Sequence, residues 1–317
     1  MSIRPREGSA VVNDVQTNEP MLGRNMWAVI IGITNYKHGS NSPALGATAD
    51  ADAFHECLER RFGVPSDHIV KLLDDHATRK NIIDSLYDHL KVNERIRPGD
   101  AIIVFFAGHG SRYKSPWHSD EFIEAIMPVD RGQSETPNGE QVQDISDREL
   151  NLFFAELRDV KGGNIIIILD CCHSGGGTRG IRSNGEMAVR FMGPMDDDCL
   201  PMLRAAESNT RKRWPKGAAM AESWTPDMTS HVLLAACKDD EEAYRSHVGG
   251  KFTRALLRQL WSRSLASATY VALLKWLDFL ADIQQPVADG EHKDSLIFRI
   301  GQKSKLSVRG KFCTSVH

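Results

Sequence analysis

Short apolar runs alternate with stretches of helical periodicity along the first half of the chain. Residues 26–33, "MWAVIIGI", form a continuous apolar run, which is typical of a strand covered on both faces. Further strands are predicted at 68–73, 101–107 and 164–170, and helices at 48–62, 78–92 and 146–160. Because strands and helices that alternate at this spacing favour βαβ units, we expect an α/β fold with a mainly parallel central sheet flanked by helices in three layers.

The alternation stops in residues 174–229, which are rich in Gly, Pro and charged side chains. A segment of this length without clear periodicity is unusual inside a compact domain, and we interpret it as a functional or cleavable linker. Regular patterns return with a strand at 231–237, helices at 251–263 and 269–283, and a last strand at 295–300. We therefore expect a short flexible leader at 1–23, one domain at 24–303 that the linker interrupts, and a tail at 304–317.

Composition excludes several classes of function. The 317 residues carry a net charge of −3, which argues against a general nucleic-acid-binding protein. No apolar run approaches the ~20 residues needed to span a bilayer, and residues 1–20 lack the apolar core of a secretory signal. Six cysteines without C-x-x-C pairs indicate reduced thiols and no zinc site. We expect a cytoplasmic monomer, with the nucleus as a second location, and neither nucleic acid nor membrane among its partners.

Two of the apolar strands end in polar turns, "GHGS" after residue 107 and "CCHSG" after residue 170. If these strands are neighbours, His109 would meet Cys171 or Cys172 at the carboxyl edge of the sheet, where parallel sheets bind ligands. A thiol beside an imidazole becomes a thiolate near neutral pH and acts as a nucleophile. The backbone N–H of Gly110 would be free to approach an oxyanion. The alternative is a buried structural cysteine with a structural histidine. The side chain of His173, next to Cys172, is expected to point elsewhere.

No other catalytic motif competes with these two turns. The sequence has no G-x-S-x-G, Walker or G-x-G-x-x-G motif. The segment "GGKFT" at 249–253 lacks the glycine spacing of a phosphate-binding loop.

The motif "FFAGHGS" followed by "LDCCHSG" resembles the catalytic pair of the caspase-like peptidases, and specifically of the metacaspases of fungi, plants and protists. The resemblance extends over most of residues 24–300, through "WAVIIGI", "GATADADAF", "IEAIMPVD", "ISDREL", "HVLLAACKDDEEAY" and "GGKFTRALL". It implies a caspase-like fold with a large-subunit-like part at 24–173 and a small-subunit-like part at 230–303. It also implies that His109 is the catalytic histidine and Cys172 the nucleophile, that Cys171 has a packing role, and that the backbone N–H groups of Gly110 and Cys172 hold the oxyanion.

Two acidic residues bear on specificity. Residues two apart on a strand face the same side, so Asp170 should face the same cleft as Cys172. A carboxylate there would attract an Arg or Lys side chain of a substrate and repel an acidic one. The resemblance implies that Asp50 is the second acidic residue of this pocket. The alternatives are an Asp170 that caps a turn and an Asp50 favoured by a helix dipole. Ala107 stands where the family commonly has Ser, which reduces the polarity of the pocket.

Calcium is not expected as a cofactor. The family's calcium segment has tandem acids, whereas residues 145–149 here read "ISDRE". The cation of Arg148 disfavours a divalent ion, because calcium takes six to eight oxygen ligands. Asp120 or Glu121 remain available as oxygen ligands. We therefore expect no metal and no cofactor, and activation by calcium is the alternative.

The expected function is that of a cysteine endopeptidase that cleaves protein or peptide substrates after Arg or Lys. Basic residues of the linker are candidate sites of self-processing, and the alternative is an exposed charged loop. These candidates are Arg179, Arg182, Arg204, Arg211, Lys212 and Arg213. A different class of function is a catalytically idle caspase-like module that binds partners in a cell-death or stress pathway.

Overall fold

The computed structural model describes most of the chain. The described residues are 22–37, 43–44, 46–134, 139–171, 188–195, 197–209, 211–237, 244–246, 249–277 and 284–299. Only residues 22 and 23 of the predicted leader are among them, and the predicted tail at 304–317 lies outside them. None of the helices in this part of the chain is long and apolar enough to cross a bilayer.

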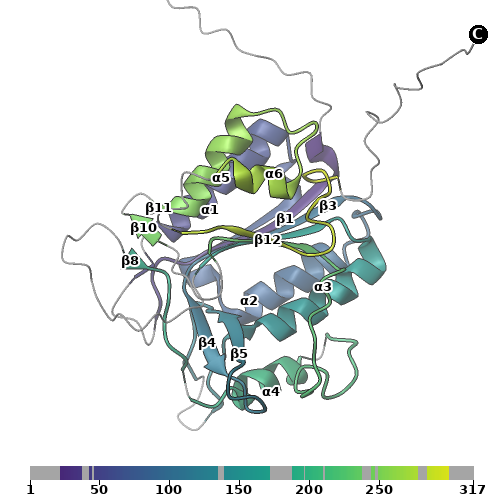
Figure 1. The fold of residues 1–317 in the computed structure, drawn as a ribbon. Helices are drawn as coiled ribbons and strands as arrows, with labels where there is room; N and C mark the ends of the chain where they lie inside the picture. The colour runs from purple at the N-terminus through teal and green to yellow at the C-terminus, as the bar shows by residue number, and fades with distance from the viewer. Residues whose placement is uncertain are drawn as a thin grey trace, which may run out of the picture.

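In the described residues, six strands form a central sheet in the order β12-β9-β7-β3-β1-β2, with helices on both faces (Figure 1). The strands are β1 Met26–Gly32, β2 Ile69–Leu73, β3 Ala101–Ala107, β7 Ile165–Asp170, β9 Val232–Ala235 and β12 Val287–Asp289. The first five pair with one another in parallel, and β12 pairs antiparallel to β9. The mainly parallel α/β sheet expected from the alternating pattern is confirmed.

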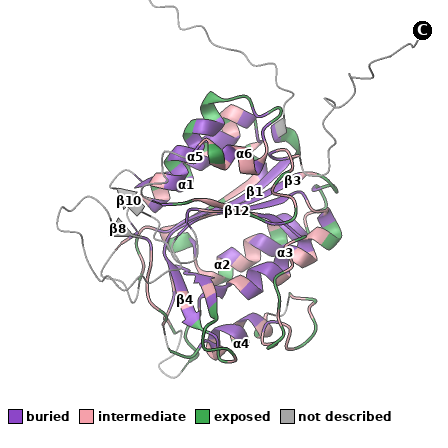
Figure 2. Cartoon of the chain, viewed as in Figure 1, coloured by how far each residue is buried: buried purple, intermediate pink, exposed green. Residues whose placement is uncertain are grey.

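Strand β1 shows why the apolar runs become central strands. All seven of its residues are buried; residues 26, 28 and 30 pack in the core on one face, and residues 27, 29 and 31 pack on the other. The first face is covered by α1 Ala47–Glu56, α5 Lys251–Ser262 and α6 Tyr270–Lys275. The second face is covered by α2 Arg79–Asp84 and α3 Asp147–Lys161. Figure 2 shows the buried residues concentrated where these helices meet the sheet.

Most helices begin and end close to the predicted positions, but the helix predicted at 269–283 is described only as α6 Tyr270–Lys275, and residues 278–283 lie outside the described residues. Thr78 caps α2 as expected, because its hydroxyl accepts a hydrogen bond from the Asn81 N–H at 3.2 Å. Ser146 caps α3 in the same way. The predicted helices at 48–62 and 78–92 continue past α1 and α2 in wider, π-type turns at 57–61 and 85–91.

The predicted last strand at 295–300 is wrong. Residues 295–299 form turns in which only an isolated bridge joins Leu296 to Thr269, and β12 takes the place of the predicted strand in the sheet. Phe298 has a φ of 59°, which a strand residue does not adopt. Its N–H donates to the Tyr270 hydroxyl at 2.9 Å and its ring is buried, so this apolar segment packs against α6 as a turn.

The described part of the linker has more regular structure than its composition predicts. It contains β8 Ala188–Val189 and α4 Leu200–Ser208. Strand β8 joins β10 Tyr244–Ser246 and β11 Gly249–Gly250 in one small antiparallel sheet, and β4 Gly110–Lys114, β5 Phe122–Ile126 and β6 Ile145–Ser146 form another. Met202 and Leu203 of α4 pack against Tyr113 and Ile123, so the linker is anchored on β4 and β5.

Candidate active site

The two polar turns lie side by side at the carboxyl edge of the sheet. Strands β3 and β7 are neighbours with Ala107 opposite Asp170, so the condition under which the two turns would meet is fulfilled. His109 follows β3 and is 1% exposed. Cys171 is buried in the core beside α2 and α3, which confirms the packing role expected for it. Cys172 lies outside the described residues, as does His173.

Tyr36 fixes the backbone of the histidine turn. Its hydroxyl accepts a hydrogen bond from the His109 N–H at 2.7 Å, and its ring centroid lies 5.0 Å from that of the imidazole. The His109 carbonyl accepts from the Met127 N–H at 3.1 Å. Burial raises the pKa of Tyr36 well above its usual range, so the phenol stays neutral. Tyr36 was missed in the sequence because it lies 73 positions from His109 and belongs to no motif.

Asp50 and Asp170 meet in one buried pocket. Asp50 projects from α1 and is 2% exposed, and Asp170 ends β7 and is 0% exposed. A guanidinium lies between them and belongs to Arg190 of the linker. It forms an ion pair with Asp50, and its Nη1 is 3.1 Å from Asp170 Oδ1. The sequence prediction that these two carboxylates share a pocket agrees with this geometry, and their role toward a substrate stays a prediction.

The electrostatics of the pocket are dominated by burial. Removal from water raises the pKa of Asp50 to about 6; the Arg190 guanidinium opposes this rise, and the nearby Asp170 adds to it. Arg190 is 0% exposed, and the two carboxylates together raise its pKa against the effect of its own burial. A charge this deeply buried is tolerated because it is paired on both sides.

The segment "GGKFT" builds the wall of this pocket. The Gly250 N–H donates to Asp50 Oδ2 at 2.8 Å, and the Thr253 hydroxyl donates to Asp170 Oδ2 at 2.6 Å. A Cβ on Gly250 would lie 2.1 Å from Asp170 Oδ2, and one on Gly249 would lie 2.3 Å from Asp50 Oδ1. Only glycine leaves room for the two carboxylates. Sequence reasoning missed this role, although the paired glycines were a signal of close approach.

The backbone of Arg190 lies against the histidine turn. The Gly110 N–H donates to the Arg190 carbonyl at 3.1 Å, and the Met192 N–H donates to the Gly110 carbonyl at 2.9 Å. Gly110 thus directs its N–H at a carbonyl, as an oxyanion donor would. Sequence reasoning missed Arg190, whose signal was its apolar setting in "AVRFM", unlike that of the other basic linker residues.

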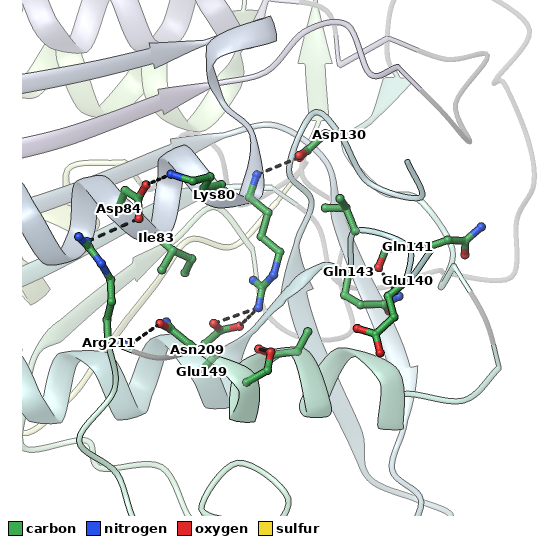
Figure 3. Close-up of a pocket in the computed structure, with 14 residues that line it drawn as sticks. Lys80, Ile83, Asp84, Asp130, Glu140, Gln141, Gln143, Glu149, Asn209 and Arg211 are labelled. Carbon is green, nitrogen blue, oxygen red and sulfur yellow. Dashed lines mark hydrogen bonds and ion pairs between the residues drawn. The ribbon is translucent and has the colours of Figure 1, made fainter. Parts of the chain in front are cut away.

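In residues 145–149, the segment compared with a calcium site, arginine side chains of the chain itself stand near the acidic groups. The Arg148 guanidinium lies 4.7 Å from the Trp117 ring centroid and 4.8 Å from that of Trp224. Glu149 pairs with Arg79 at 2.8 Å in a polar cavity of about 480 Å³ (Figure 3). Among the described residues, no group of three His, Cys, Asp or Glu side chains is arranged to hold a metal ion. The cavity is lined by residues of both charges, Asp84 and Arg211 among them, and by neither His109 nor the acidic pair.

Comparison with known proteins identifies a family that matches the whole domain and relatives that match parts of it. The sequence profile of the family described as "Caspase domain" matches residues 25–304. Metacaspase-2 of Trypanosoma brucei brucei is 30% identical over 166 residues, 49% of this chain and 43% of that protein. Metacaspase-4 of Arabidopsis thaliana is 32% identical over 159 residues, 47% of this chain and 33% of that protein. Metacaspase-3 of Arabidopsis thaliana is 26% identical over 239 residues, 72% of this chain and 56% of that protein.

A solved structure supports the fold. The crystal structure of protein GSU0716 from Geobacter sulfurreducens superposes with a TM-score of 0.56 at 19% identity, over 83% of this chain and 92% of that one. The chain spans only 33% to 56% of the length of the three curated relatives.

Proposed function

Because this chain belongs to the caspase-domain family, we propose that it is a cysteine endopeptidase that hydrolyses peptide bonds after Arg or Lys. The observation that carries the specificity is the pair of buried carboxylates, Asp50 and Asp170, closed around a guanidinium at the sheet edge that bears His109. A bidentate acidic pocket suits a planar guanidinium or an ammonium, and it repels an acidic side chain.

The chemistry follows from the residues at this edge. The Cys172 thiolate attacks the scissile carbonyl, and His109 passes a proton to the leaving amine. The N–H groups of Gly110 and Cys172 stabilise the oxyanion, and loss of one such donor typically costs about 10²–10³ in rate. Support for this assignment comes from the adjacency of β3 and β7 and from the direction of the Gly110 N–H. Tyr36 is a positioning residue, since it holds the backbone of the turn and not the reacting atoms.

We also propose that the enzyme needs no metal or other cofactor and acts as a cytoplasmic monomer on protein or peptide substrates, without nucleic acid or membrane partners. Cleavage within the linker would make the intact chain a zymogen. The hydrogen bond from Arg148 to the Ala221 carbonyl and the ion pair of Glu149 with Arg79 support independence from calcium, because they leave fewer oxygens for an ion.

A second candidate function is an idle module that binds partners. Its support is the pocket itself, which a side chain of the same protein already fills. An idle module and an enzyme that has not yet been cleaved would both hold Arg190 in the pocket, so an activity measurement decides between them.

The test uses fluorogenic peptides with Arg, Lys, Asp or Asn before the scissile bond. Purified protein, Cys172→Ala and the matched control Cys171→Ala are assayed in parallel. We expect cleavage of the Arg and Lys peptides by the protein and by Cys171→Ala, and none by Cys172→Ala. Turnover by Cys172→Ala would disprove the nucleophile assignment, and preference for Asp would disprove the acidic pocket. No turnover of any peptide by fresh or incubated protein would favour the binding module.

A further inference from the structure

Residues 188–191 of the linker lie against the candidate site: Ala188 and Val189 form β8, and Phe191 forms a bridge with Gly110 of the histidine turn. We infer that this segment is bound in cis as a substrate, and that Arg190–Phe191 is the peptide bond that the protein cleaves in its own linker. The inference rests on the proposed function and adds to it a defined cleavage position and a mode of regulation.

The side chain of Arg190 satisfies the requirement for the residue before the scissile bond. Its guanidinium binds both carboxylates of the acidic pocket and donates to the Asp170 carbonyl at 3.2 Å. No part of the side chain is exposed. The proposed specificity places a substrate's Arg in this position, and the linker already supplies one.

The backbone satisfies the second requirement independently. The Arg190 carbonyl, which would become the oxyanion, accepts from the Gly110 N–H at 3.1 Å. On its amino-terminal side, Val189 pairs antiparallel with Tyr244, and Ala188 pairs with Arg245 of β10. An extended peptide that adds a strand to a sheet edge is a common mode of peptide recognition. A purely structural arginine would need the ion pairs but not this placement of its carbonyl.

Apart from Arg190, the basic residues of the linker that the structure describes are exposed or paired elsewhere; Arg213 and Lys216 are exposed and belong to no strand. Arg204 is exposed on α4, where a helical backbone does not present an extended bond. Arg211 pairs with Asp84, the last residue of α2, and with Asp88 in the turns that follow it. Lys212 pairs with Glu207. Arg179 and Arg182 lie outside the described residues.

The cleavage balances with water as the only added reactant. The thiolate of Cys172 bonds to the Arg190 carbonyl carbon, and the electron pair of the C=O bond moves to the oxygen. The C–N bond to Phe191 then breaks, and the Phe191 amine leaves with a proton from His109. Water hydrolyses the thioester, which releases the Arg190 carboxylate and restores the thiol. Until this happens, an external substrate competes with a segment whose effective concentration is set by its attachment to the same chain.

The experiment incubates the purified full-length chain and identifies its fragments by intact mass and N-terminal sequencing. We expect a new N-terminus at Phe191, formed at a rate independent of protein concentration, and none in Cys172→Ala. Arg190→Lys, which keeps the positive charge, should still be cut at this bond. Arg190→Gln should be cut there at least about thirtyfold more slowly, as expected for loss of a buried charge pair. Arg204→Gln is the matched linker control and should be cut at the wild-type rate.

Cleavage of Arg peptides in trans is measured in the same samples. If the protein cleaves these peptides but its linker stays intact, or is cut only at other basic residues, the inference is wrong and the proposed function stands. The same holds if Arg190→Gln is cut after residue 190 as fast as the wild type. If Cys172-dependent cleavage of Arg or Lys peptides is absent, the proposed function fails and the inference fails with it. The mapping of the wild-type fragments does not depend on the folding of any variant.

Discussion

Replacing Asp50 by Asn tests whether the acidic pocket selects the substrate. Asp50 carries one of the two charges that bind the guanidinium of Arg190, and a substrate's Arg would occupy the same place. An amide at this position keeps the shape and an oxygen for the Gly250 N–H, so the change removes mainly the charge. The variant is compared in chains that also carry Arg190→Gln, because weaker binding of the chain's own guanidinium would otherwise offset weaker binding of the peptide.

The expected size of the effect follows from the geometry. Two unit charges about 4 Å apart attract by about 4 kcal/mol at an effective dielectric constant of roughly 20. Asp170 retains its charge and water solvates part of the opened pocket, so we expect a loss of about 2 kcal/mol, or about thirtyfold in kcat/KM for Arg peptides. The Lys peptide should lose a similar factor.

Asp52→Asn is the matched control on the same helix. The Asp52 side chain is 54% exposed and pairs with Lys71, away from the pocket. Its substitution should change kcat/KM by less than about twofold, as for a typical exposed ion pair. Equal activity of the two variants on Arg peptides, with both folded by circular dichroism, would refute the assignment of Asp50.

Three further predictions follow from the same contacts. Gly250→Ala places a methyl group 2.1 Å from Asp170 Oδ2 and should lower kcat/KM for Arg peptides at least about tenfold. The control Gly193→Ala, where a Cβ meets open space, should leave kcat/KM unchanged. Equal kcat/KM values for the two variants would contradict the close packing at Gly250. Folding raises the pKa of Asp50 to about 6, so between about pH 4 and 6 the folded chain retains a proton that the unfolded chain has released. The free energy of unfolding of the protein, relative to that of Asp50→Asn, should therefore fall as pH rises through this window, which thermal denaturation measures. A relative rise would contradict the sign of this shift. Calcium at about 10⁻³ M, the weak end of protein calcium sites, should change the activity by less than about twofold relative to chelator, and strong activation would show that oxygen ligands remain available.

The centre of the sheet was predictable because β1, β3 and β7 are long and apolar on both faces. Five predicted strands become β1, β2, β3, β7 and β9, whereas the adjacency of β3 and β7, which the sequence left as a condition, is given by the fold. The strand at 295–300 failed because its apolar residues are equally suited to a buried turn, and only the contact of Phe298 with Tyr270 decides between the two. Strands β6, β8 and β11 have two residues each, too few for any periodicity to show.

The candidate site was predictable where a residue carries its own chemistry. Histidine and aspartate at strand ends are visible in a sequence, and the family resemblance added Asp50. Gly250, Tyr36 and Arg190 were not visible, because their roles depend on contacts across tens to hundreds of positions. The Gly250 N–H reaches Asp50 across 200 positions, and Arg190 reaches it across 140. Only the folded chain shows that a basic residue of the linker lies between the two acids.

The inferred cleavage after Arg190 would change the charge balance of the pocket itself. Before cleavage, one guanidinium lies between two carboxylates, and the neighbouring Arg190 carbonyl is neutral. Hydrolysis turns that carbonyl into a third carboxylate at the Gly110 N–H, next to a pocket whose two acids are buried. Like charges about 4 Å apart repel by about 4 kcal/mol at an effective dielectric constant of roughly 20. The repulsion weakens binding of the new chain end, so cleavage favours withdrawal of Arg190 and leaves an acidic pocket open to the Arg or Lys of another protein.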